Sequence, residues 1–188
     1  MNTAHLELLR SAGWRELLRD FIVPFALEGV DFGGLGDDVL EIGPGPGLTT
    51  DLLMEQLTAL TALELDSSLA IELEERLGGT VEVVEGDATA MPFEPGRFSA
   101  VVSFTMLHHV PTPEMQDRLF AEVHRVMRPG GLFVANDSVA SKELAALHDG
   151  DVYNPVDPTG VADRLRAAGF ARIAVRHNDF GWAAHAYC

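Results

Sequence analysis

From residue 37 onward, short apolar runs alternate with amphipathic segments, and this alternation restricts the possible folds more than any other feature of the chain. The strand-like runs cover 39–43, 60–65, 81–86, 98–104 and 132–137. The helix-like segments cover 48–56, 67–77, 113–127 and 157–168, and Ser67 is the expected cap of the second. Strands that alternate with helices in this way form a mostly parallel sheet with helices packed on both faces.

The last two strand-like runs, 170–175 and 182–187, have no helix between them. A short polar turn from His177 to Gly181 joins them, and a connection of that length can only link antiparallel neighbours. We therefore predict an α/β fold: a doubly wound, mostly parallel seven-stranded sheet with an antiparallel C-terminal hairpin strand and helices on both faces.

The first thirty residues carry leucines and other apolar residues at helical spacing. We expect Gly13 to break this region into two helices and Pro24 to disturb the end of the second. We also expect Trp14 and Trp182 in the core. Residues 1–30 are thus predicted as N-terminal helices, and residues 31–188 as the single globular unit that follows them.

The charge balance argues against several kinds of partner. The chain has 29 acidic and 13 basic residues, for a formal net charge of -16. Nucleic acids and anionic membrane surfaces are bound largely through Lys and Arg, so neither is expected as a partner. No run approaches the roughly 20 apolar residues of a membrane span, and the N-terminus lacks a secretory pattern. A cytoplasmic location is the expectation, and the sequence leaves the oligomeric state open.

A glycine-rich turn, Glu41-Ile-Gly-Pro-Gly-Pro-Gly47, lies between the first strand and the first following helix. Glycines at this place let the backbone turn tightly and let a ligand approach closely. The spacing is G-x-G-x-G, with Leu48 where a dinucleotide fingerprint has its third glycine, and the lysine of a P-loop is missing. Glu41 would repel a pyrophosphate and favour a cation, so a phosphate ligand is disfavoured.

Two more carboxylates follow the next two strands. Glu64 ends the second strand, where a carboxylate can accept hydrogen bonds from both ribose hydroxyls. Asp87 follows the third strand and can accept a hydrogen bond from an exocyclic amine. The implied ligand contains an adenine, a ribose and a positive charge without phosphates, and S-adenosylmethionine meets that description.

With these residues in view, the chain resembles the class I S-adenosylmethionine-dependent methyltransferases, close to the small-molecule branch that includes quinone-biosynthesis enzymes. The segments that carry the resemblance are VLEIGPGPGLTT, ALELD, VVEGDATAMPF, FSAVVSFTMLHHV and EVHRVMRPGGLFV, within 37–187. It implies S-adenosylmethionine as cofactor, S-adenosylhomocysteine as product, and N-terminal helices that cover the active site. The expected cofactor-binding residues are Glu41, Gly43, Gly45, Gly47, Glu64, Leu65, Asp87, Ala88 and Thr105.

The acceptor side offers weaker signals. His109 is the candidate general base, and His108, His148 and Tyr153 are the candidate substrate-binding residues, although these histidines could equally close the pocket and the later segment could be a solvated loop. The ribose could also bind Asp66 instead of Glu64. A metal site built from His108, His109 and His148 is conceivable, but their spacing matches no recognised metal site, so no metal is expected.

The predicted function is methyl transfer to a small-molecule acceptor, with oxygen, carbon and nitrogen acceptors all open. The fourth strand is followed by SFTMLHH and not by an Asn-Pro-Pro-Tyr-like stretch, which argues against the amide- and base-amine-methylating enzymes. One alternative is a non-catalytic S-adenosylmethionine-binding protein or regulatory subunit. Another is an NAD-dependent oxidoreductase, which the loop spacing and Glu41 oppose.

Overall fold

A computed structural model describes residues 2–188 and shows one seven-stranded sheet with the strand order β3-β2-β1-β4-β5-β7-β6. The strands are β1 (Val39–Ile42), β2 (Leu60–Glu64), β3 (Glu82–Glu85), β4 (Phe98–Phe104), β5 (Met127–Ser138), β6 (Arg172–His177) and β7 (Gly181–Tyr187). Neighbours among β1 to β5 pair in parallel, whereas β7 pairs antiparallel with both β5 and β6. The predicted doubly wound sheet with an antiparallel C-terminal hairpin is confirmed.

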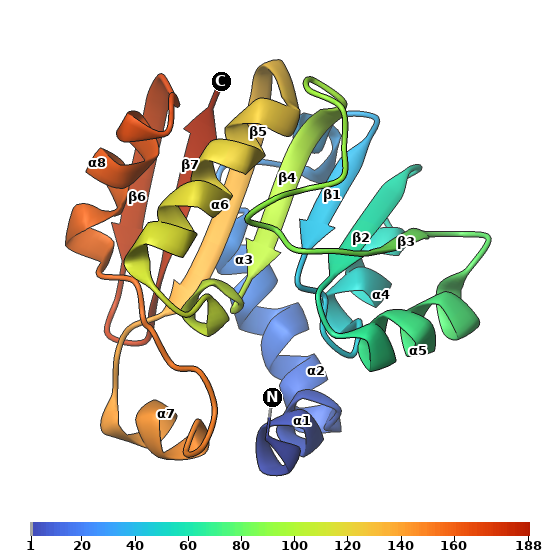
Figure 1. The fold of residues 1–188 in the computed structure, drawn as a ribbon, viewed down its shortest axis with the longest axis vertical. Helices are drawn as coiled ribbons and strands as arrows, with labels where there is room; N and C mark the ends of the chain where they lie inside the picture. Colours follow the sequence, from blue (N-terminus) through green and yellow to red (C-terminus); the bar gives the residue numbers. More distant parts are fainter. Residues whose placement is uncertain (1) are drawn as a thin grey trace.

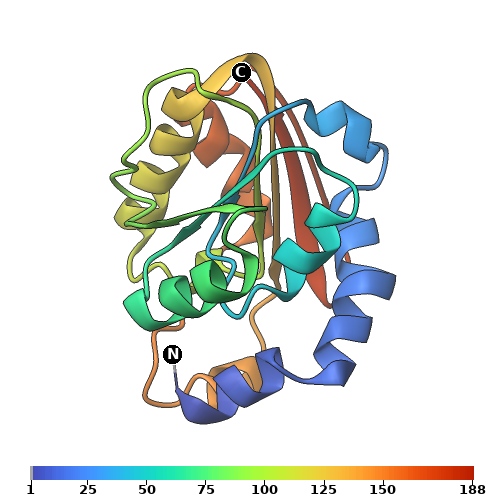
Figure 2. The ribbon, with the colours of Figure 1, turned by 90° about the vertical axis from the view of Figure 1, so that its right-hand side faces the viewer.

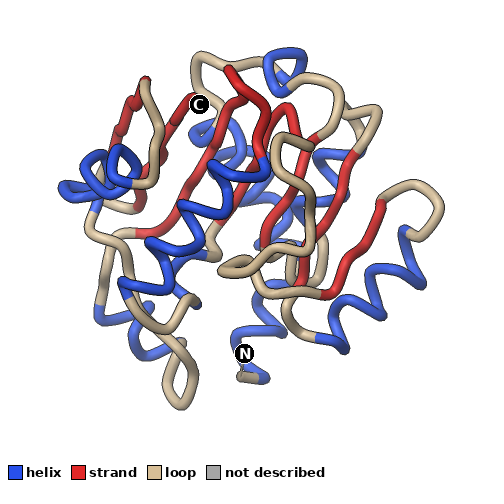
Figure 3. The backbone as a smooth tube through the Cα atoms, turned by 45° about the horizontal axis from the view of Figure 1, so that its top comes forward, coloured by secondary structure: helices blue, strands red, loops and turns tan. Residues whose placement is uncertain are grey.

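Helices cover both faces of this sheet (Figures 2 and 3). They are α1 (Thr3–Leu9), α2 (Ala12–Leu17), α3 (Val23–Ala26), α4 (Leu48–Met54), α5 (Ser67–Leu77), α6 (Pro113–Val126), α7 (Lys142–Leu147) and α8 (Pro158–Ala167). One core cluster joins α6 and α8 to one face through side chains such as Phe120 and Leu165. A second joins α3 and α4 to the other face through Ala26 and Leu53.

The strand order reverses between β1 and β4, whose carboxyl ends lie at the bottom of Figure 1. Open α/β sheets bind their ligands beyond the carboxyl ends of the strands at such a reversal. Two short helices, α1 and α7, lie beyond this same edge of the sheet (Figure 1). The fold therefore places the N-terminus and the segment after β5 where a ligand is expected.

Three local predictions were wrong in detail. The N-terminal helices separate at Ser11, whose side chain accepts a hydrogen bond from Trp14 N at 3.1 Å, while Gly13 lies inside α2. Asp66, rather than Ser67, caps α5: its side chain accepts hydrogen bonds from the backbone N–H groups of Ser68 and Leu69. The segment after β5, considered as a solvated loop, contains α7, capped by Ser141.

None of the helices in residues 2–188 combines the length and the apolar character that crossing a membrane requires.

Candidate functional site

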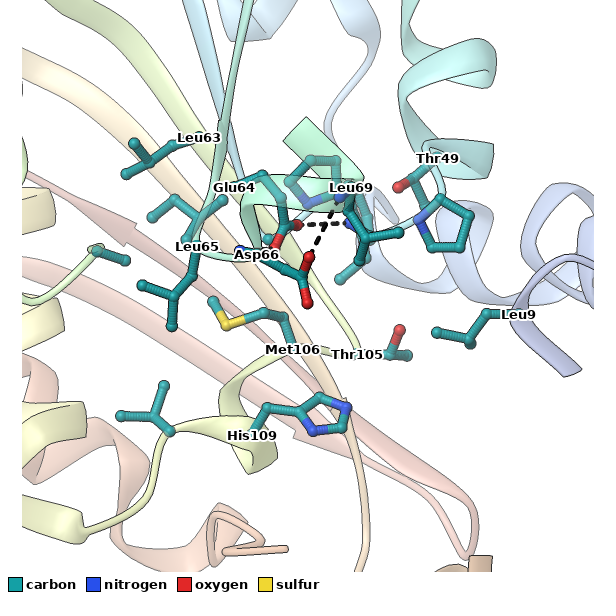
Figure 4. Close-up of a pocket in the computed structure, with 18 of the residues that line it drawn as sticks. Leu9, Thr49, Leu63, Glu64, Leu65, Asp66, Leu69, Thr105, Met106 and His109 are labelled. Carbon is teal, nitrogen blue, oxygen red and sulfur yellow. Dashed lines mark hydrogen bonds between the residues drawn. The ribbon is translucent and has the colours of Figure 1, made fainter. Parts of the chain in front are cut away.

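A cavity of about 410 Å³ opens at the carboxyl edge of the sheet, within the usual size range of small-molecule sites. Its wall combines the ends of β1, β2 and β4, the turn after β3, and the N-terminal helices. In Figure 4, Glu64 lies on one side of the view and His109 on the other, with Thr105 and Met106 between them. The cavity thus joins the two groups of residues that the sequence singled out separately.

The three glycines of the loop after β1 have different surroundings, although all three have positive φ. A Cβ on Gly43 would collide with Met106, and one on Gly47 would collide with Leu73 and Arg76. A Cβ on Gly45 would meet no protein atom within 4 Å, and Gly45 lines the cavity. Gly47, an expected cofactor contact, lies outside the cavity wall and serves helix packing, whereas Gly45 leaves open space for a ligand.

Glu41 lies behind the loop and does not line the cavity. Its buried carboxylate accepts hydrogen bonds from the hydroxyls of Thr49 and Thr50, the latter at 2.7 Å. Burial raises the pKa of Glu41 to about 7, against the opposing effect of the two threonine hydrogen bonds. Glu41 was predicted to contact the cofactor, but its side chain instead connects β1 to the first turn of α4.

Glu64 lines the cavity and connects the loop to β2. One carboxylate oxygen accepts a hydrogen bond from Gly45 N and the other from Asp66 N, both at 2.9 Å. Burial raises the pKa of this carboxyl, while the backbone hydrogen bonds act in the opposite direction. Asp66, the alternative ribose partner, also lines the cavity and uses one oxygen of its carboxylate to cap α5.

Three other predicted cofactor contacts also line the cavity: Leu65, Asp87 and Ala88. Leu65 is 69% exposed, so its apolar side chain is available to cover a planar ring. The Asp87 carboxylate accepts a hydrogen bond from Thr89 N at 2.7 Å, which shapes the turn after β3. These residues complete the side of the cavity that lies at the ends of β2 and β3.

Thr105 follows β4 and is the one non-glycine residue in the described chain with positive φ, at +49°. Its N–H donates to Asn136 O at 2.8 Å, which fixes this backbone against the end of β5. A β-branched residue in the left-handed region costs of order 1–3 kcal/mol, and such strain concentrates at functional sites. Thr105, a cofactor contact implied by the family resemblance, lines the cavity.

His109 belongs to a cluster of aromatic rings, four imidazoles and one phenol, at the other side of the cavity. It comprises His5, His108, His109, His148 and Tyr153, with ring centroids 4.2–5.9 Å apart between contacting pairs. Within the cluster only His109 lines the cavity. His108, His148 and Tyr153 were expected to bind the substrate, but they lie outside the cavity wall. Sequence analysis missed His5, because nothing near it in the chain indicates its distant partners.

The environment of the cluster disfavours positive charge on two of its rings. Burial lowers the pKa of His109 to about 3, and the neighbouring His108, His5 and His148 lower it further. Burial and the same kind of neighbours lower the pKa of His5 to about 4. Both rings are therefore neutral near pH 7, with a lone pair available on one nitrogen of each.

His108 is held in place by an acidic partner. Its backbone N–H donates to one Asp137 oxygen at 2.9 Å, and its Nδ1 lies 2.6 Å from the other. Both residues are buried, at 6% and 1% exposure. This pairing orients the start of the short helical turn Leu107–His109 and thereby the His109 ring.

The N-terminal helices form part of the cavity wall. Leu9, Trp14 and Leu18 line it, so Trp14 does not belong to the core, whereas Trp182 is fully buried as expected. These three apolar side chains come from segments that precede β1. They limit the access of water to the space between Glu64 and His109.

Comparison with known proteins identifies the central part of the chain. Residues 40–135, just over half of the chain, match the family model described as "Methyltransferase domain". A ribosomal RNA small subunit methyltransferase A of Cupriavidus metallidurans is 44% identical over 70 residues, covering 35% of this chain and 25% of that protein. A phthiotriol/phenolphthiotriol dimycocerosates methyltransferase of Mycobacterium tuberculosis is 36% identical over 122 residues, covering 62% and 43%.

The fold has solved counterparts along its whole length. A SAM-dependent methyltransferase from Aquifex aeolicus superposes with a TM-score of 0.74 at 16% identity, covering 100% of this chain and 98% of that one. The sequence matches, by contrast, span only about a quarter to three fifths of the length of the curated relatives.

Proposed function

The chain belongs to the methyltransferase domain family of S-adenosylmethionine-dependent proteins, and on that premise we propose that it transfers a methyl group to a small-molecule acceptor held beside Thr105 and His109. The observation that supports this proposal is the continuous cavity from Glu64 to His109. A single space of this kind accommodates a cofactor at one side and an acceptor at the other.

The residues at the strand ends suit the cofactor. The open space at Gly45 permits a close approach to the backbone, and the Glu64 carboxylate adjoins it. Glu64 would accept hydrogen bonds from the ribose hydroxyls and Asp87 one from the adenine amine. Cofactor contacts by Gly43, Leu65, Ala88 and Thr105 belong to the same proposal. When bound, the cofactor supplies a methyl group that is already activated by the positive charge on sulfur.

The acceptor side needs mainly to align the acceptor and exclude water, because the leaving group is activated before binding. Thr105 and His109 border the space that remains beyond the cofactor residues. Neutral His109 can accept a hydrogen bond from the acceptor and so orient the attacking atom. The N-terminal helices α1 and α2, which place Leu9 and Trp14 in the cavity wall, would cover the bound acceptor.

A small molecule is favoured over RNA by charge. The net charge of -16 opposes the phosphate contacts that supply most nucleic-acid affinity. The match to the ribosomal RNA enzyme covers only 70 residues, 35% of this chain and 25% of that protein. The longer match, to the mycobacterial enzyme, includes a larger share of this chain.

An acceptor screen that follows S-adenosylhomocysteine release tests the proposal. The panel contains phenols, thiols, amines, activated carbon acids and a small-subunit ribosomal RNA fragment. We expect turnover with a small molecule and none in a Gly45→Val variant. Turnover with RNA alone would overturn the acceptor class. Cofactor binding without turnover on any acceptor would favour the non-catalytic alternative, and binding of NAD in place of S-adenosylhomocysteine would overturn the cofactor assignment.

A further inference from the structure

Three histidines from distant parts of the chain meet at the acceptor side of the cavity. His5 comes from α1, His109 from the turn after β4, and His148 from the C-cap of α7. One ring nitrogen from each lies within 4.8 Å of the other two. The helices that bring them together, α1 and α7, lie beside each other beneath the sheet (Figures 1 and 2).

Two ring nitrogens of this cluster, His5 Nδ1 and His148 Nε2, are buried without a hydrogen-bond partner. Within residues 2–188, five buried side-chain polar atoms have no partner, and three of them are His5 Nδ1, His108 Nε2 and His148 Nε2. His5 and His148 are only 4% and 3% exposed. Buried polar atoms in folded proteins are almost always satisfied, so their concentration here points to a ligand that satisfies them.

The tautomer of His148 prepares it for such a ligand. Its Nδ1 lies 2.6 Å from Leu144 O, and because a carbonyl oxygen only accepts, Nδ1 carries the proton. In the neutral form of the ring, Nε2 then carries the lone pair. Histidines that bind metals usually donate their other N–H to a carbonyl or carboxylate in this manner, which fixes the ring and the tautomer.

We propose that His5, His109 and His148 bind one divalent transition-metal ion, with Zn²⁺ as the favoured ion, and leave a fourth coordination position open toward the cavity. Three neutral imidazoles are a ligand set that Zn²⁺ accepts, and catalytic zinc sites keep such an open position. Mg²⁺ and Ca²⁺ prefer oxygen ligands and are disfavoured. Tetrahedral Zn–N bonds separate neighbouring nitrogens by about 3.4 Å, so binding would draw the three rings slightly together.

Outer contacts already hold two of the three segments in register, those that carry His5 and His148. The Asn2 side chain donates to Leu147 O at 2.8 Å and accepts from His5 N at 2.9 Å. Its backbone N–H donates to the Asp151 carboxylate at 3.0 Å. Asn2 thus joins the start of α1 to the segment that carries His148. Asp151 also lines the cavity, so a negative charge adjoins the proposed cation.

The open position would have a direct use in methyl transfer, a consequence that rests on the proposed function. His109 belongs both to the cavity wall and to the proposed ligand set, and with the ion bound its one lone pair would coordinate the metal in place of accepting a hydrogen bond from the acceptor. An acceptor with a hydroxyl or thiol group could coordinate the ion there, lose its proton to solvent, and present an anionic oxygen or sulfur to the cofactor side. The acceptor class that this favours is a coordinating phenol, alcohol or thiol.

The test measures metal binding without any activity. Tag-free protein is dialysed against a chelator and titrated with Zn²⁺ in a calorimeter, and Co²⁺ is added separately to detect the visible absorption of a tetrahedral site. We expect one equivalent to bind. His5→Ala and His148→Ala should each weaken Zn²⁺ binding by more than about 100-fold, since loss of an outer partner alone costs 10–100-fold. His177→Ala, a change at an exposed histidine of β6, should leave binding unaltered.

Folding and the proposed function are checked separately. Neither His5 nor His148 lines the cavity, so both variants should keep wild-type affinity for S-adenosylhomocysteine, which also shows that they are folded. No Zn²⁺ binding by the wild type, or undiminished binding in both variants, would overturn the metal site. S-adenosylhomocysteine release with an acceptor and without metal would leave the proposed function standing while the metal proposal fails.

Discussion

The cavity has two halves that the chain builds in different ways. The glycine-loop half consists of residues 43–46, Glu64 and Asp87, all of which follow or end a parallel strand. The histidine half consists of His109 in the cavity wall and of His5 and His148, which contact its ring but do not line the cavity; the three come from separate segments. The first half lies entirely within the family match at 40–135, whereas His5 and His148 fall outside it.

This difference indicates which half is general and which is particular to this chain. The glycine-loop half depends on local backbone geometry and on carboxylates placed by strand ends, so any sheet of this topology can reproduce it. The histidine half depends on which helices the N-terminus and the connection after β5 bring over the cavity. Specificity for the acceptor is expected to reside there, because connecting segments vary while the scaffold persists.

The largest effect is expected at Gly45, and it tests whether the glycine-loop half binds the cofactor. Gly45→Val should abolish detectable S-adenosylhomocysteine binding in calorimetry, since its side chain would occupy the open space at the cavity wall. Gly29→Val is the matched control: Gly29 also has positive φ and open surroundings but lies outside the cavity wall. Equal affinity in the two variants, both folded by circular dichroism, would remove Gly45 from the site.

The next effect concerns the histidine half and separates it from the first. His109→Ala should slow methyl transfer in single turnover by about 10²–10⁴-fold, the scale for a group that assists the attacking atom. S-adenosylhomocysteine affinity should change less than about twofold. Similar losses in His5→Ala and His148→Ala would show that the three rings act as one unit, as metal ligands would. A rate loss fully explained by weaker cofactor binding would show that His109 contributes to cofactor binding and not separately to the acceptor side.

Glu41 provides a pH-dependent test of the support behind the glycine loop. Its pKa of about 7 in the folded protein exceeds the ordinary value of 4.5, so the folded state holds the proton more tightly. The resulting stability is fully present below about pH 4.5 and is lost as the pH rises through about 7. Urea unfolding at several pH values should show a fall of about 3 kcal/mol in wild type relative to Glu41→Gln. Parallel pH profiles would contradict the buried position of this carboxyl.

A smaller effect distinguishes two neighbouring carboxylates at the end of β2. Glu64→Ala should weaken S-adenosylhomocysteine binding by about 1.5–3 kcal/mol, the scale for hydrogen bonds to a charged group. Asp66→Ala should instead lower the free energy of unfolding by about 1 kcal/mol through loss of the α5 cap, with little change in affinity. The reverse pattern, measured by calorimetry and thermal unfolding, would assign the ribose to Asp66.

Much of the fold could be predicted from the sequence because its determinants are local. The alternation of apolar and amphipathic segments located β4 (Phe98–Phe104) at its observed bounds and α6 (Pro113–Val126) within one residue. The C-terminal hairpin followed from a short polar turn. Gly45, Glu64 and Asp87 were placed at the cavity because the ends of parallel strands meet at one edge of the sheet.

Other features were decided only when distant segments met. Glu41 was expected to contact the cofactor, yet Thr49 and Thr50 lie within reach and take both of its oxygens. Gly47 was expected at the ligand, yet helix α5 packs against it. Neither outcome can be read from spacing, because each depends on the path by which the following helix returns to the sheet.

By itself, then, the sequence determined the sheet, its hairpin and the glycine loop, since periodicity and turn chemistry act over a few residues. Only the tertiary structure brought His5, His109 and His148 to within 4.8 Å of one another. Their meeting depends on α1 docking against the end of α7, through Asn2. Such a contact joins residues at opposite ends of the chain, and no local pattern encodes it.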